Sequence, residues 1–119
     1  MLLLCYPKCS TCQRAQRWLD GHGISYDLRD IKLERPTLDE LKTWYAKSLP
    51  LKHFFNTSGL IYKNMQLKER LPEMGEGEQL MLLSSDGMLV KRPILIGDGF
   101  VLVKSNGRHS VPLLVIHNI

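Results

Sequence analysis

The sequence has no long apolar segment and few cysteines. Its first apolar run, residues 2–6, is far too short to cross a bilayer or to act as a secretory signal, and no basic segment precedes it. Of the 3 cysteines, two form a close pair and the third stands alone. Small secreted domains held by disulfides usually have an even number of cysteines, so this pattern does not indicate one. We therefore expect no membrane association and a cytoplasmic location, where a close cysteine pair is more often redox-active or metal-binding than structural.

The chain also lacks the charge pattern of a nucleic-acid-binding protein. It carries 16 Lys and Arg against 12 Asp and Glu, and its few aromatic residues are not interleaved with basic ones. We expect no direct nucleic-acid binding. The net charge of +4 instead favours a small anion or an acidic protein surface as a partner.

The apolar patterns at the two ends of the sequence predict strands. Residues 2–6 are typical of a buried strand, 11–20 of an amphipathic helix, and 24–31 of an alternating strand. A strand–helix–strand unit of this kind predicts two parallel strands. Residues 94–96 and 100–103, on either side of a glycine-containing turn, predict a β-hairpin.

Helices are expected in the middle of the chain. Thr37 and Glu40 have the spacing of a capping box, which marks a helix start. Further short helical segments are predicted at 51–56, 65–71 and 76–83, followed by a turn at 84–87. The expected fold class is therefore α/β, a mixed sheet with a helical subdomain inserted at about residues 37–83, in a single domain over residues 1–119.

The pair Cys9 and Cys12 follows directly after the first predicted strand, where the first helix begins. Unpaired N–H groups at a helix start stabilise a thiolate, so Cys9 is expected to be the reactive nucleophile. Cys12, inside the first helical turn, would be the resolving thiol of a Cys9–Cys12 disulfide. A zinc site is the alternative, but the chain has no second cysteine pair and no histidine pair with ligand spacing. Cys5, in the strand, is expected to be a packed core residue.

A second candidate group lies before the predicted hairpin, at Arg92 and Pro93. A proline that starts a strand after a charged residue is a candidate for a cis peptide bond. In a thioredoxin-like fold such a proline lies opposite the cysteine turn, which would aim the Arg92 guanidinium at Cys9 and suit a tetrahedral oxyanion. The hydroxyl and N–H groups of Ser10 and Thr11 are expected to help bind such an anion.

Three segments together resemble the ArsC/Spx family: residues 6–12 (YPKCSTC), 49–59 (LPLKHFFNTSG) and 91–97 (KRPILIG). The resemblance covers residues 2 to about 103. It implies a thioredoxin-like fold with a helical insertion. Members of the family include glutaredoxin-coupled arsenate reductases and Spx, a redox-sensing regulator that binds the C-terminal domain of the RNA polymerase α subunit.

The resemblance also implies roles for individual residues. Cys9 matches the nucleophile that attacks arsenate, Arg92 an arginine that contacts the oxyanion, and Pro93 the family's cis-proline. It implies no bound cofactor, glutathione as a co-substrate, and glutaredoxin or thioredoxin as the protein that recycles the thiols. The phosphatase type of arsenate reductase is excluded because it needs Cys-x5-Arg, and Ala15 and Trp18 stand six residues after the two cysteines.

Several positions depart from the named members. Glutaredoxin-coupled reductases usually have another residue at the position of Cys12, whereas Spx proteins have a cysteine there. The reductases have a second oxyanion-binding arginine near the position of Asn56. Spx proteins have a glycine in their polymerase-binding region, and here Ser48 stands near that position. Arg108 could correspond to a later arginine of the family, but the residues around it do not match. Two hypotheses follow. The first is a thiol-dependent, arsenate reductase-like enzyme that reduces a small oxyanion or a thiol/disulfide substrate, and the second is an Spx-like redox-sensing regulator that binds the RNA polymerase α subunit.

Overall fold

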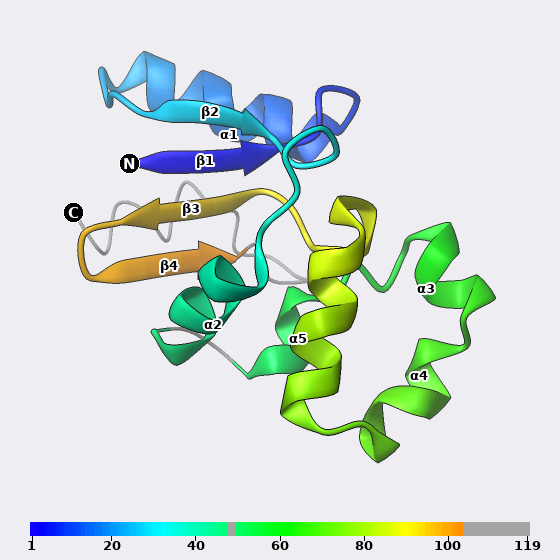
Figure 1. The fold of residues 1–119 in the computed structure, drawn as a ribbon. Coiled ribbons are helices and arrows are strands. Elements are labelled where there is room, and N and C mark those ends of the chain that lie inside the picture. The colour runs from blue at the N-terminus through cyan, green and yellow to red at the C-terminus, as the bar shows by residue number, and fades with distance from the viewer. Residues whose placement is uncertain (48–49, 104–119) are drawn as a thin grey trace.

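A four-stranded mixed sheet forms one side of the molecule (Figure 1). The computed structural model describes residues 1–47 and 50–103. The strands are β1 (Leu2–Cys5), β2 (Asp27–Asp30), β3 (Ile94–Gly97) and β4 (Phe100–Val103), in the order β2-β1-β3-β4. Strand β1 pairs in parallel with β2 and antiparallel with β3. The predicted α/β class, parallel pair and hairpin are confirmed.

Strand β1 is an interior strand whose side chains alternate between two cores. Leu3 and Cys5 belong to a small cluster that also contains Cys12 and Leu19 of helix α1 (Ser10–Gly21). Leu4 belongs to the larger cluster on the opposite face of the sheet, and Leu2 and Tyr6 pack against that cluster. Because side chains on a strand point alternately to its two faces, α1 covers one face of the sheet and the helical insertion covers the other.

The insertion consists of seven short helical elements in the described chain. They are α2 (Leu38–Ala46), η1 (Leu51–Phe54), α3 (Leu60–Asn64), α4 (Leu67–Arg70), η2 (Leu71–Glu73), α5 (Glu76–Ser85) and η3 (Gly87–Leu89), where η marks a 3-10 helix. The sequence prediction missed α3, a helix of 5 residues that is too short to show a periodic apolar stripe. It also ended α5 too early, since Ser84 and Ser85 belong to the helix rather than to a turn.

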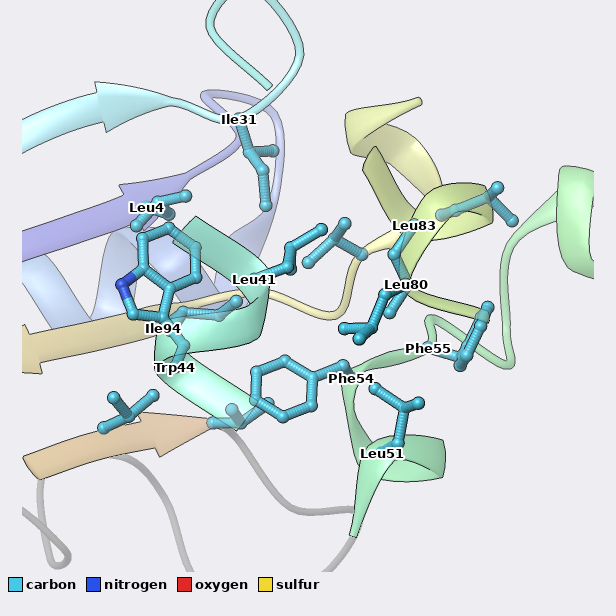
Figure 2. Close-up of a cluster of buried hydrophobic side chains, with 14 of the residues drawn as sticks. Leu4, Ile31, Leu41, Trp44, Leu51, Phe54, Phe55, Leu80, Leu83 and Ile94 are labelled. Carbon is cyan, nitrogen blue, oxygen red and sulfur yellow. The ribbon is translucent and has the colours of Figure 1, made fainter. Parts of the chain in front are cut away.

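The larger core joins the insertion to the sheet. Trp44 of α2 and Phe54 of η1 lie between the strands and α5, close to Ile94 of β3 (Figure 2). Leu80 and Leu83 extend the cluster along the inner side of α5. Burying aromatic and branched side chains of this size supplies the main favourable free energy for holding the helices on the sheet.

Two glycines are required by the backbone. Gly87 begins η3 against the end of β2, and a Cβ there would overlap the carbonyl of Ile31. Gly99 has a φ of +79° in the two-residue connection between β3 and β4, a conformation that side chains with a Cβ rarely adopt. These positions fix where the insertion returns to the sheet and where the hairpin turns.

A charged contact also ties the sheet to the insertion. The Arg29 guanidinium on β2 donates to both Glu40 carboxylate oxygens, at 2.7 and 2.8 Å. Glu40 is the third residue of α2 and completes the predicted capping box with Thr37, which is confirmed. The bond from Arg29, together with the contact to Thr37, lowers the pKa of Glu40 to about 2.

Some expectations fall on residues outside the described ranges. Ser48, Arg108 and the segment 104–119 are among them. Within the described part of the chain, no helix has the length and the apolar character needed to cross a membrane.

We expect the Glu40→Gln variant to lose roughly 1–3 kcal/mol of unfolding free energy at pH 7, because it removes the charge from a bidentate, partly buried contact. The folded-state pKa of Glu40 lies below its ordinary value of 4.5, so this stabilisation is complete above that value and disappears as the pH falls towards about 2. Urea unfolding at pH 7 and pH 3 measures both effects.

The variant should therefore lose less stability than the wild type between pH 7 and pH 3. Lys42→Ala, at an exposed position on the same helix, is the matched control and should leave the stability nearly unchanged. Equal acid-induced losses in wild type and Glu40→Gln would contradict the role assigned to this carboxylate.

Candidate functional site

The cysteine turn connects β1 to α1 and is held by its own backbone. The Cys9 N–H donates to the Tyr6 carbonyl at 2.9 Å, which closes the loop. Gln13 then fixes the loop from inside the helix: its N–H donates to the Cys9 carbonyl at 3.1 Å, and its side-chain amide donates to the Pro7 carbonyl at 2.9 Å. Cys9 is thus placed as the N-cap of α1, where the sequence predicted it.

The start of α1 has the properties of an anion site. Cys9 has an extended backbone, with φ −85° and ψ 117°, and its side chain makes no capping hydrogen bond. The first turn contains no acidic residue. Ser10 is exposed there, and the Thr11 hydroxyl oxygen lies 3.5 Å from an Arg14 guanidinium nitrogen. The positive end of the helix dipole and nearby arginine charge therefore favour an anion at this end.

The two cysteines of the pair differ sharply in environment. Cys9 is half-buried, whereas Cys12 is 0 % exposed in the cluster beneath β1. Cys12 shares a buried cluster with Cys5, Cys9 packs against that cluster, and both side chains interact with the Cys12 thiol. The contact with Cys5, and then burial, raise the pKa of Cys12 well above the usual range of a thiol, although the contact with Cys9 acts in the opposite direction. Cys12 is therefore a protonated, protected thiol and Cys9 is the accessible one.

Arg92 reaches the cysteine turn through Tyr6. Strands β1 and β3 pair Leu4 with Ile94, and continuing this antiparallel register brings Tyr6 opposite Arg92. The Arg92 guanidinium carbon lies 5.4 Å from the centre of the Tyr6 ring, a cation–π contact. The peptide bond between Arg92 and Pro93 is cis, as the sequence predicts. The order of strands thus places this arginine next to the residue that opens the turn.

The guanidinium of Arg92 faces the insertion side of the sheet. One of its nitrogens lies 3.4 Å from each of the Met88 and Val90 carbonyl oxygens, at the long end of the range for hydrogen bonds. Arg92 also lines a pocket of about 490 Å³ in which Asn56 and Met88 take part, together with residues 58–61. Asn56, near which the resemblance puts a second arginine of the reductases, therefore shares a pocket with Arg92.

The predicted site residues fall into two adjacent groups. Cys9, Ser10, Thr11 and Cys12 share the start of α1, on the face of the sheet that Cys5 also faces. Arg92 and Pro93 lie at the start of β3, where the arginine contacts the Tyr6 ring and the two carbonyl oxygens of the insertion.

Sequence reasoning missed three contributors to this region. They are Tyr6, which stacks with the arginine, Gln13, which secures the loop, and Cys5, whose thiol meets Cys12. Cys5 is buried, as predicted for a packed strand residue, and only the alternation of β1 could have indicated that it points towards α1. Within the described residues, no three His, Cys, Asp or Glu side chains are arranged to hold a metal ion.

Comparisons with known proteins place the chain in a family. A model of the ArsC family matches residues 4–107. An uncharacterised protein of Bacillus subtilis, YusI, is 53% identical over 90 residues, which cover 75% of this chain and 76% of that protein. The regulatory protein MgsR of Bacillus subtilis is 33% identical over 104 residues, covering 85% of this chain and 79% of MgsR.

Solved structures support the same fold. The crystal structure of a possible arsenate reductase from Streptococcus mutans superimposes with a TM-score of 0.85. It is 40% identical in sequence, and the match covers 96% of each chain. The thioredoxin-like fold with a helical insertion is therefore confirmed.

The difference in burial predicts selective alkylation. We expect iodoacetamide at pH 7 to modify Cys9 at least about 10-fold faster than Cys5 or Cys12, because alkylation requires an accessible thiolate. Mass spectrometry of tryptic peptides after short reaction times measures the rate at each position. Equal rates at Cys9 and Cys12 in the folded protein would contradict the placement of the two thiols.

Proposed function

This chain belongs to the ArsC family, and on that premise we propose that it is a thiol-dependent reductase of the arsenate reductase type, with Cys9 as its nucleophile. Cys12 or glutathione serves as the resolving thiol. The reductase needs no bound cofactor, and glutathione acts as a co-substrate. Glutaredoxin or thioredoxin returns the thiols to the reduced state.

The observation that carries this proposal is the position of Cys9. It is a half-exposed thiol at the start of a 12-residue helix whose N-cap side chain makes no capping bond, so an anion can approach both the sulfur and the first N–H groups. Arg92 adds a positive charge on the neighbouring strand, where its guanidinium contacts the Tyr6 ring on the insertion side of the sheet. Fixed dipoles and charge of this kind stabilise the negative charge of a tetrahedral oxyanion in the transition state.

The proposed reaction has two chemical steps. The Cys9 thiolate attacks the arsenic of arsenate, a sulfur–arsenic bond forms, and an oxygen leaves as water after protonation. A second thiol then attacks the Cys9 sulfur, and the electron pair of the sulfur–arsenic bond stays with arsenic. Arsenic is reduced from the +5 to the +3 state and leaves as arsenite, while two thiols are oxidised to one disulfide.

The contacts of Cys12 support a role as an internal second thiol, and its burial limits that role. Cys12 lies in the first turn of α1, three residues after Cys9, and the two side chains interact, so the attack needs little movement. Its raised pKa, caused by the Cys5 contact and by burial, keeps it protonated at neutral pH and slows the attack. Glutathione reaches the half-exposed Cys9 without this penalty, which supports a mixed disulfide as the competing route.

We expect purified protein to reduce arsenate in the presence of glutathione and glutaredoxin. Cys9→Ser should lose the activity entirely. Arg92→Lys should lower kcat/KM about 10-fold or more, because lysine keeps the charge but not the planar fork of donors. Arg17→Lys, an exposed position on α1, is the matched control and should behave as the wild type. Activity of Cys9→Ser equal to that of the wild type would overturn the proposal.

Asn56 offers a gain-of-function test. Its side chain lines the pocket that also contains Arg92, and it supplies no charge. We expect Asn56→Arg to lower the KM for arsenate several-fold by adding a second cation beside the first. Asn56→Gln, which adds length without charge, is the control. An unchanged KM in Asn56→Arg, in a protein whose thermal unfolding matches the wild type, would place anion binding elsewhere.

A redox-sensing regulator is the second candidate function. Two observations favour it: the similarity to the regulatory protein MgsR, and the cysteine at position 12, which Spx proteins share. In this alternative, oxidation of Cys9 and Cys12 changes the surface of the turn and alters binding to the RNA polymerase α subunit. We expect the tagged protein to capture the C-terminal domain of the α subunit to a different extent in its reduced and oxidised states. No capture in either state would count decisively against the regulator.

A further inference from the structure

Cys5 is a buried nucleophilic group that the reductase mechanism does not use. It ends β1, is 3 % exposed, and points to the face of the sheet covered by α1. Its backbone carbonyl accepts a hydrogen bond from Ile31 at 2.9 Å, which holds the end of the strand in place. Its side chain shares a buried cluster with Cys12 and interacts with the Cys12 thiol, which raises the pKa of Cys12. Cys5 is therefore fixed beside the resolving thiol rather than being an isolated core residue.

Cys12 interacts with both of the other thiols. The Cys5 and the Cys9 side chains both act on the Cys12 thiol. The three side chains share one apolar cluster, in which Leu3 and Leu95 take part. Within the described residues they are not arranged around a common point as metal ligands would be. Thiol–disulfide exchange needs an attacking sulfur next to the central sulfur of a disulfide, and this arrangement provides one.

We propose that Cys5 is a second disulfide partner for Cys12: once a Cys9–Cys12 disulfide has formed, Cys5 displaces Cys9, which leaves a buried Cys5–Cys12 disulfide and a free Cys9 thiol. This inference rests on the Cys9–Cys12 disulfide of the proposed function. It assigns to the oxidised chain a second redox form in which the exposed nucleophile is available again.

The exchange is balanced within the protein. The Cys5 sulfur attacks the Cys12 sulfur, the bond between Cys12 and Cys9 breaks, and the bond between Cys5 and Cys12 forms. The proton that Cys5 loses is taken up by the Cys9 sulfur, so one disulfide and one thiol are present before and after. The two-electron oxidation belongs to the earlier step and comes from the oxyanion substrate or from a small disulfide such as oxidised glutathione.

The surroundings favour the exchanged form. Cys9 is half-exposed, so its sulfur can leave as a solvated anion, while Cys5 and Cys12 are enclosed by apolar side chains. The exchanged form therefore places the neutral disulfide in the apolar cluster and leaves the ionisable thiol at the half-exposed position, where a thiolate is solvated. Because Cys5 and Cys12 belong to one buried cluster, the attack has the high effective concentration of an intramolecular reaction.

Peptide mapping distinguishes the two disulfides. The wild-type protein is oxidised with oxidised glutathione, sampled over time, quenched at low pH, and alkylated with N-ethylmaleimide under denaturing conditions. Trypsin cuts after Lys8 and Arg14, so a Cys9–Cys12 disulfide stays inside the peptide 9–14, whereas a Cys5–Cys12 disulfide joins the peptides 1–8 and 9–14. We expect the internal form to appear first and the joined form, with maleimide on Cys9, to become the larger fraction.

Two variants control the assignment. Cys5→Ala should stop at the internal Cys9–Cys12 disulfide, and Cys9→Ser should lose most of the joined form because it lacks the exposed thiol that starts oxidation. Thermal unfolding checks that both variants fold, and the wild-type time course alone tests the exchange if one does not.

The outcomes separate this inference from the proposed function. An internal disulfide that persists with maleimide on Cys5 overturns the exchange and leaves the reductase intact. A joined form with maleimide on Cys12 also overturns it, because Cys12 is then not the shared thiol. If neither disulfide forms in the wild type or in Cys5→Ala, the exchange falls together with the role of Cys12 as resolving thiol.

Discussion

The pairing of β1 with both of its neighbours is the constraint on which the site depends. As an interior strand, β1 is hydrogen-bonded along both edges and buried on both faces, with Leu3 and Leu4 each 0 % exposed. If the pairing of β1 shifted by one residue, each of its side chains would point to the opposite face of the sheet and leave the core that it now fills. The register of β1 is therefore strongly specified. The same register sends Cys5 towards α1 and Tyr6 towards the insertion. The thiols and the arginine therefore approach the end of one strand from opposite sides.

The chemical difference between Cys9 and Cys12 follows from the way α1 is anchored. The buried stripe of α1, through which the helix packs on the sheet, consists of Cys12, Ala15 and Leu19. Cys9, at the N-cap, lies at the edge of this packed surface and is half-buried. Anchoring and reactivity are thus properties of one short segment, and changing Cys12 affects both the packing of the helix and the chemistry of Cys9.

Local patterns predicted most of the elements, because strand alternation, the Thr37–Glu40 box and the glycine turn at 97–99 are encoded by neighbouring residues. Local patterns also placed the cysteine pair at the helix start. The missed features depend on residues distant in sequence. Arg92 contacts Tyr6 because strands β1 and β3 pair. The helix α3, with 5 residues, is too short for an apolar pattern in its own sequence to indicate it. The contact of Cys5 with Cys12 likewise requires the packing of a helix on a strand.

The charge around the turn sets how an anion must be held. Arg29 pairs with Glu40, but no carboxylate among the described residues forms a salt bridge with Arg92, whose neighbours are an aromatic ring and two carbonyl oxygens. Asn56 adds a dipole to the same pocket but no second cation. In the proposed reductase, which has Asn56 where the resemblance puts a second arginine, the N–H groups of the first turn of α1 would supply a larger share of the stabilisation of an oxyanion. Because Cys12 is part of the buried stripe that anchors that turn, binding of the anion in this mechanism would depend on the same buried thiol that is proposed to resolve the intermediate.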